Sequence, residues 1–242
     1  MAYHVSFRYP LWKYDKTAVI ESFLRQRDIS ARLKITLPIG GKSFTFISLY
    51  QAVDEARTRL FLGQDPSAAI AAGRAVLSGC GGSLPPYYQA ECLRLASMLA
   101  MLSADFAEQR GLSGLSSVRQ AVADARQAVS ILSAEIENPA QLARALLRLS
   151  QAQPYSPALV AEGLAACKTV CDGQGYSEGF ALRGSLRLLQ ARAAASPKER
   201  RALAQQAQND LALAVKKNPL LARVYEKPIA QVQALLGTPA SP

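Results

Sequence analysis

Hydrophobic positions follow two different periods along this chain of 242 residues. Before about residue 49, apolar and polar residues alternate in short runs, which is the period of a β-strand. From Leu49 onward, apolar residues recur every three or four positions, which is the period of an amphipathic helix. The change of period divides the chain into two predicted parts, residues 1–48 and residues 49–242.

The first part is predicted to be a small α/β cap with a hairpin at residues 32–48. There the sequence RLKITLPIGGKSFTFIS has two alternating runs around Gly40-Gly41. A Gly-Gly loop fits the primed turns of a β-hairpin, because both positions can take a positive φ. With Ile39 opposite Lys42, Leu37 falls opposite Phe44. A strand at the N-terminus and a short helix from Asp15 complete a βαββ order, whose apolar hairpin face packs on the first helices.

The second part is predicted to be all helical. Gly and Pro residues interrupt the helical pattern at short intervals, as at Asp65-Pro66 and Asn138-Pro139. Short loops between successive helices favour antiparallel hairpins that stack on one another rather than one closed bundle. The predicted helices are 49–62, 66–78, 85–110, 115–136, 139–152, 156–171, 176–196, 198–217 and 220–236.

An internal repeat supports the stacked arrangement. One helix of each pair carries small or aliphatic residues at i, i+4 and i+7, and its partner carries a Leu-Arg pair after a small or apolar residue. Small side chains allow the next hairpin to approach closely, and several hairpins are needed to bury a continuous core. The first set is Ala68, Ala72, Ala75; Ala121, Ala125, Ala128; Val160, Leu164, Cys167; and Ala207, Leu211, Ala214. The second set is Cys92-Leu93-Arg94, Leu146-Leu147-Arg148 and Ala181-Leu182-Arg183.

The spacing and two sequence segments resemble known helical repeats. Leu147 and Leu182 are 35 residues apart, near the period of about 34 residues in tetratricopeptide repeats. Gly63-Gln64-Asp65-Pro66 precedes an Ala-rich helix, and the segment RQAVADARQAVSIL follows a long helix. Together they resemble the C-terminal helical repeats of large bacterial serine/threonine protein kinases, over residues 49–236. We therefore expect a mainly α protein, a tetratricopeptide-like α-solenoid behind the cap.

The resemblance implies a regulatory or scaffolding region that binds a protein or peptide in the bacterial cytoplasm. The catalytic motifs His-Arg-Asp and Asp-Phe-Gly are absent from the chain, so a kinase domain of the parent protein would lie outside it. The interpretation is a non-catalytic protein–protein interaction module without a cofactor. Partner identity and oligomeric state stay open.

Five charged residues are the candidates for partner binding. Arg94, Arg148 and Arg183 share the Leu-Arg position of the repeat, and Glu91 and Arg187 lie one turn from two of them. One hypothesis is a basic ladder on the first-helix face that binds an acidic segment or a C-terminal carboxylate. The alternative is that each arginine pairs with a carboxylate or backbone group of a neighbouring repeat.

The charge of the chain leaves a second class of partner open. The net charge is +10, of which residues 1–50 carry +5, residues 51–172 carry −1 and residues 173–242 carry +6. These basic N-terminal and C-terminal segments can bind an acidic protein, a membrane surface or nucleic acid. A nucleic-acid-binding helical repeat is therefore the second hypothesis, although only Tyr225 offers an aromatic ring near the basic residues.

The basic residues near position 200 differ from those near position 216. Lys216 and Lys217 end a predicted helix, where cations complement the helix dipole. Lys198, Arg200 and Arg201 begin the same helix, where cations oppose it. Helix stability alone does not account for this second group.

Motifs for chemistry are weak. Ile39-Gly40-Gly41-Lys42-Ser43 resembles a P-loop only in part, because its first glycine would fall on Thr36 and a strand follows. His4 is the one histidine, which leaves a triad without support. Cys167 and Cys171 share a helix face, but Cys80 and Cys92 are scattered, so we expect buried thiols rather than a metal site. No apolar run reaches membrane length and no signal-peptide core is present, which predicts a soluble cytoplasmic protein.

Overall fold

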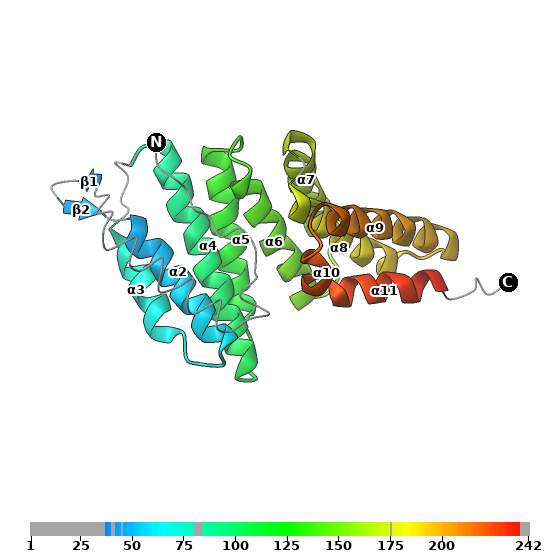
Figure 1. Cartoon of the computed structure of the whole chain (residues 1–242), viewed down its shortest axis with the longest axis horizontal. Coiled ribbons are helices and arrows are strands. Elements are labelled where there is room, and N and C mark those ends of the chain that lie inside the picture. Colours follow the sequence, from blue (N-terminus) through cyan, green and yellow to red (C-terminus); the bar gives the residue numbers. More distant parts are fainter. Residues whose placement is uncertain (1–36, 40–41, 45, 80–83, 175, 238–242) are drawn as a thin grey trace.

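The computed structural model describes residues 37–39, 42–44, 46–79, 84–174 and 176–237, and there the protein is mainly α-helical (Figure 1). The predicted N-terminal strand and short helix lie outside the described residues. Two short strands, β1 (Leu37–Ile39) and β2 (Lys42–Phe44), come before the helices. The helices are α2 (Phe46–Phe61), α3 (Ser67–Ser78), α4 (Pro86–Gln109), α5 (Leu115–Ile131), α6 (Glu137–Ala152), α7 (Pro157–Gln174), α8 (Ser177–Ala193), α9 (Pro197–Lys217), α10 (Leu221–Val224) and α11 (Glu226–Gly237).

The hairpin has the predicted register. β1 pairs antiparallel with β2, with Leu37 opposite Phe44 and Ile39 opposite Lys42. This pairing places Gly40-Gly41 at the turn, where the sequence predicted a two-residue loop. The pairing of the two strands is confirmed, whereas the βαββ order of the whole cap stays a prediction.

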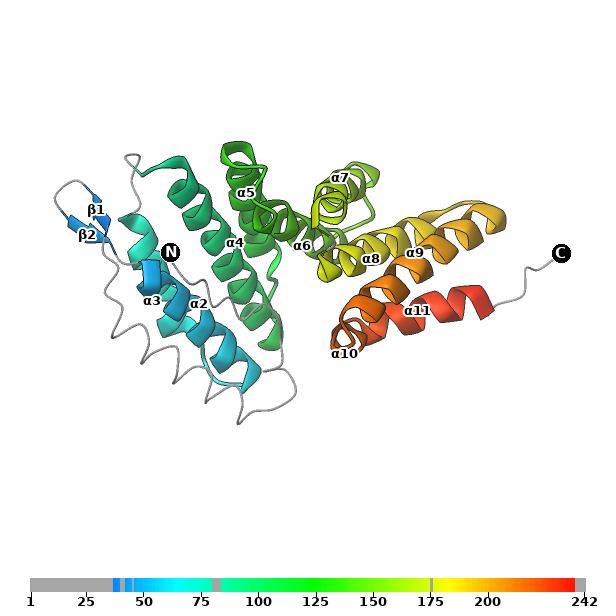
Figure 2. The ribbon, with the colours of Figure 1, turned by 45° about the horizontal axis from the view of Figure 1, so that its top comes forward.

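The helices pack in the order of the chain. The pairs α2 and α3, α4 and α5, α6 and α7, and α8 and α9 each pack together. The first helices also contact one another in order: α2 contacts α4, α4 contacts α6, and α6 contacts α8. Figures 1 and 2 show α2 to α6 in one row and α8, α9 and α11 in a second group, joined through α6 and α7. The hydrophobic core therefore lies between helices that are neighbours in the array.

Small side chains sit at the closest approaches, as the repeat predicted. Ala121, Ala125 and Ala128 of α5 are fully buried, the first two in a cluster that runs from α4 to α8. Val160 and Cys167 of α7 belong to the same cluster. Ala207 and Ala214 of α9 pack in the next cluster, with α8, α10 and α11. Burial of these residues confirms the predicted stripe in three of the four hairpins.

The predicted stripe in the first hairpin was wrong. Ala68, Ala72 and Ala75 of α3 are exposed, and the buried stripe is shifted by one residue to Ala69, Gly73 and Val76. A Cβ added at Gly73 would come within 2.6 Å of the Leu99 side chain on α4. Because α3 carries alanine on several sides, its sequence does not distinguish two neighbouring stripes.

Two helix ends also differ from the prediction. The helix expected over 115–136 ends at Ile131, and the Asn138 side chain donates a hydrogen bond to the Leu132 carbonyl at 2.8 Å. The helix expected over 220–236 is broken at Tyr225. Pro228 explains this break, because it has no N–H to donate to the Val224 carbonyl and its ring collides with that carbonyl.

Gly114 gives a test of the α4–α5 packing. A Cβ at this position would lie 2.7 Å from the Ala104 carbonyl oxygen and 2.9 Å from the Ala104 Cα. Backbone atoms cannot move aside as the tip of a side chain can, so Gly114→Ala is expected to lower the free energy of unfolding by about 2 kcal/mol in urea unfolding. Gly237→Ala is the control, because nothing lies within 4 Å of its added Cβ. Equal losses in the two variants would contradict this packing.

Candidate functional site

Polar side chains connect each first helix to the next along one side of the array. Tyr50 of α2 donates a hydrogen bond to Glu91 of α4. Gln141 of α6 donates to the Ser97 hydroxyl of α4 at 3.0 Å. Arg144 of α6 forms an ion pair with Glu178 of α8. The first-helix face is the name used here for Tyr50, Arg57, Glu91, Arg94, Ser97, Gln141, Arg144, Arg148, Tyr176, Glu178 and Tyr225.

The pair of Arg144 and Glu178 lies in a cluster of several hydrogen bonds on this face. The Arg144 Nε and Nη2 atoms donate to the two Glu178 carboxylate oxygens at 2.8 and 2.7 Å. The Tyr176 hydroxyl accepts from Arg144 Nη2 at 3.0 Å and donates to Glu178 at 3.3 Å, and the Tyr225 hydroxyl donates to Glu178 at 3.4 Å. The cluster thus ties together α6, α8 and the break between α10 and α11.

The pKa values in this cluster reflect a shielded but charged pair. Burial disfavours both charges, but the opposite partner outweighs it, so the pKa of Arg144 is raised and the pKa of Glu178 is lowered. Burial raises the pKa of Tyr176 to about 12 and also raises the pKa of Tyr225, where the Glu178 charge adds to the effect. At neutral pH the cluster is an ion pair held by two neutral phenols.

Arg57 of α2 is a further cation of this face. Its pKa is lowered mainly by burial, and it also responds to the charges of Arg144 on α6 and Glu178 on α8. Its side chain keeps 25% of its surface exposed and lies 3.5 Å from Asp54. Arg57 is therefore half-buried, and solvent still reaches it.

Glu91 and Arg94 lie together at the α2–α4 contact. Arg94 Nε donates to Glu91 at 2.8 Å, and Arg94 Nη2 donates to the Tyr50 hydroxyl at 3.2 Å. Burial lowers the pKa of Arg94, but the hydrogen bond and the charge of Glu91 together outweigh burial, so the net shift of the pKa is upward. The Arg94 side chain is only 10% exposed and the Glu91 side chain only 8%. This pair mainly joins two helices.

The other three candidate residues pair with different helices. Arg148 of α6 reaches back to Asp105 and Glu108 of α4. Arg183 and Arg187 of α8 share Asp210 of α9, each with a closest N–O distance of 2.6 Å. The structure therefore brings together Glu91 with Arg94, and Arg183 with Arg187, but leaves Arg148 apart from both. Arg148 pairs with carboxylates of a neighbouring hairpin, whereas the carboxylate partners of Arg94 and Arg183 lie within their own hairpins.

The sequence analysis missed the residues at the centre of the face. Arg144 and Glu178 are 34 residues apart in the chain, which is about the period of the repeat. A search for opposite charges one repeat apart on the first helices would have found this pair. Gln141 was missed for another reason, since it is an uncharged side chain whose buried amide donates to Ser97 and accepts from Arg144.

The cysteines have the environment of buried thiols. Cys92, Cys167 and Cys171 are buried. Burial raises the pKa of Cys167 to about 12 and raises that of Cys171 as well, so both are thiols at neutral pH. In the described part of the chain, no three His, Cys, Asp or Glu side chains gather as a metal site would require. None of the helices described is both long and apolar enough to cross a bilayer.

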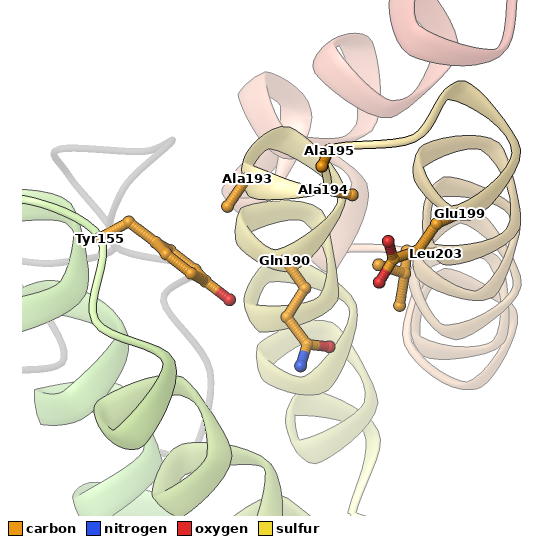
Figure 3. A pocket seen from close by; sticks show the side chains of 7 residues that line it. All are labelled: Tyr155, Gln190, Ala193, Ala194, Ala195, Glu199 and Leu203. Carbon is orange, nitrogen blue, oxygen red and sulfur yellow. The ribbon is translucent and has the colours of Figure 1, made fainter.

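A separate hollow lies between the α6–α7 loop and the end of the α8–α9 hairpin. It has a volume of about 250 Å³. Figure 3 shows the Tyr155 ring reaching across it toward Gln190, with Glu199 and Leu203 on the α9 side. Its lining residues are Tyr155, Gln190, Ala193, Ala194, Ala195, Glu199 and Leu203.

These features define a mainly helical protein whose hairpins are joined by hydrogen bonds and ion pairs along the first-helix face. No protein-family model, no curated protein and no solved structure matches the chain. Its function is therefore inferred from the chemistry of its own surfaces.

Proposed function

We propose that this chain is a non-catalytic helical-repeat module, a tetratricopeptide-like α-solenoid, that binds another protein along its first-helix face. The observation that carries the proposal is the ion pair between Arg144 and Glu178, because it crosses from one hairpin to the next along this face. Its two side chains are 23% and 21% exposed. The charged groups of this face are thus held in position while part of each stays open to a partner.

Fixed charges favour binding because little conformational entropy is lost when a ligand docks. Arg148 is the best candidate for direct contact. Within the described residues its Nη2 atom alone donates, to Asp105 and Glu108, so Nε and Nη1 have no partner there. These two atoms can donate to a ligand, and guanidinium groups bind carboxylates with two parallel hydrogen bonds. A segment of the partner with an acidic side chain or a C-terminal carboxylate suits this arrangement.

The cellular setting is part of the same proposal. Gly63-Gln64-Asp65-Pro66 and the Ala-rich helix that follows support a regulatory or scaffolding region of a bacterial serine/threonine kinase in the cytoplasm. In that setting the catalytic domain would lie outside this chain. The module would position a substrate or regulator rather than transfer a phosphate.

Arg148→Gln tests the proposal. We expect the variant to lose at least about tenfold in recovery of a specific partner in affinity capture with quantitative mass spectrometry, because a charge-assisted hydrogen bond is lost. Arg126→Gln is the matched control. It breaks a bidentate pair with Glu162 at 2.7 and 2.6 Å between α5 and α7, on the second helices. Unchanged recovery of every specific partner by Arg148→Gln, or an equal loss with the control, would reject this face.

A further inference from the structure

Cations that have no carboxylate partner among the described residues gather at the end of the α8–α9 hairpin. Most arginines of the first helices have a carboxylate partner, as Arg144 and Arg148 do. Arg192, Lys198 and Arg201 are exposed, and none of them contacts a carboxylate within the described residues. Arg200 donates only to the Ala194 carbonyl, at 3.2 Å. Four cations thus lie within ten residues beside one carboxylate, Glu199.

The stability of α9 does not explain this cluster. The helix begins at Pro197, and the Ser196 side chain caps it by accepting from the Glu199 N–H at 3.1 Å. The free N–H groups of the first turn carry partial positive charge, so cations there repel the helix end. Lys198, Arg200 and Arg201 therefore oppose folding of this turn, which is expected where charge serves contact with a partner.

The hollow beside these cations supplies an apolar contact. Arg200 binds the carbonyl of Ala194, which lines the hollow, so this guanidinium lies at its rim. Tyr155 is one of the large hydrophobic side chains that stay exposed, at 42%. The Tyr155 ring, Leu203 and three alanines form the apolar walls (Figure 3). The volume of about 250 Å³ suits one side chain of a partner rather than a larger ligand.

We propose that the α8–α9 tip, defined as Tyr155, Gln190, Arg192, Lys198, Arg200, Arg201 and Leu203, docks an acidic segment of a partner polypeptide. The cations contact its carboxylates, and one of its apolar side chains enters the hollow. A polypeptide fits better than a nucleic acid, because the hollow has room for a single side chain and Tyr155 alone cannot stack a run of bases. The tip lies at the far end of α8 from Glu178, so this inference stands independently of the first-helix face.

Binding of a defined acidic peptide tests the inference. The probe is a fluorescein-labelled peptide of Asp and Glu around one Phe, measured by fluorescence anisotropy with the intact chain. Combined replacement Lys198→Gln, Arg200→Gln and Arg201→Gln is expected to weaken binding at least about tenfold, because three charge contacts are lost. Thermal stability should stay the same or rise, because cations leave a helix N-terminus. Tyr155→Ala should weaken the Phe peptide but not the same peptide with Ala in place of Phe.

The control carries the same change of charge elsewhere. Arg119→Gln, Lys216→Gln and Lys227→Gln together remove three exposed cations away from the tip, and this variant should bind within about threefold of the unmodified chain. Equal weakening by the two triple variants, or no binding of the peptide, would overturn the proposal. Tighter binding of a single-stranded oligonucleotide, lost in the tip variant, would assign the tip to nucleic acid instead. If Tyr155→Ala binds the Phe peptide as tightly as the unmodified chain does, the hollow is not part of the interface.

Discussion

Asp210→Ala is expected to lower the free energy of unfolding by about 3 kcal/mol, one of the two largest effects of a single change predicted for this chain. Asp210 is 4% exposed and accepts hydrogen bonds from Arg183 Nε and Nη2 and from Arg187 Nη1. Removing the carboxylate leaves two guanidinium groups without their partner, and breaking a buried ion pair costs about 3–5 kcal/mol. The arginine side chains are partly exposed, so water compensates in part. Urea unfolding followed by circular dichroism measures the loss.

The control for Asp210 is a pair of the same geometry on the surface. Glu162 binds Arg126 through both oxygens, but the two side chains are 34% and 48% exposed. Glu162→Ala is expected to cost less than about 1 kcal/mol, since exposed ion pairs contribute little. A similar loss in both variants would show that burial of Asp210 is not what makes its pair important.

The helical order was predictable because local signals suffice for it. Proline and glycine mark almost every interruption, and most helix ends fall within a few residues of those marks. The break at Tyr225 was missed because Pro228 was not weighed inside an otherwise helical pattern. The stripe of α3 was missed because Ala68 and Ala69 are chemically identical, and only the position of α4 decides which of them is buried.

The candidate site was harder to predict because it depends on rotation about each helix axis. Ser97 of α4 donates to the Ala121 carbonyl at 2.8 Å, and a Cβ at Gly184 of α8 would lie 3.0 Å from the Ala207 carbonyl. Ser97 and Gly184 are thus equivalent positions, because each faces a backbone carbonyl of the second helix of its own hairpin. Arg94 lies three residues before this position and Arg183 one residue before it. The difference of two residues rotates a side chain by about 200°.

The Leu-Arg pairs therefore looked equivalent in sequence while their arginines point to different helices. Arg94 contacts Tyr50 of α2, whereas Arg183 contacts Asp210 of α9. The hairpins are therefore better aligned on the small residue where the first helix approaches the backbone of the second helix, as at Ser97 and Gly184, than on the neighbouring arginine. With that reference, opposite charges one repeat apart, as in Arg144 and Glu178, become the signal to search for.

Glu178→Gln is the second change with a large expected effect, about 3 kcal/mol at neutral pH. The Glu178 carboxylate accepts from Arg144, Tyr176 and Tyr225. Glutamine keeps the size of the side chain but loses the charge, so the Arg144 guanidinium is left without a counterion in a shielded place. We expect a loss of cooperativity between α8 and the C-terminal helices in urea unfolding. Glu226→Gln, at an exposed position of α11, should leave the unfolding free energy within about 0.5 kcal/mol.

The pH dependence of this effect has a definite sign. The pKa of Glu178 is lowered in the folded chain from its ordinary value of 4.5, so the fold gains stability from ionised Glu178 above that value. This gain is lost as the pH falls through the lowered pKa of the folded state. The difference in unfolding free energy between the unmodified chain and Glu178→Gln should therefore be full at pH near 7 and shrink in acid. A difference in unfolding free energy that stays constant or grows as the pH falls below 4.5 would contradict an ion pair between Glu178 and Arg144. A carboxylate whose pKa is lowered by folding stabilises the fold as an ion, so its contribution must decrease when acid protonates it.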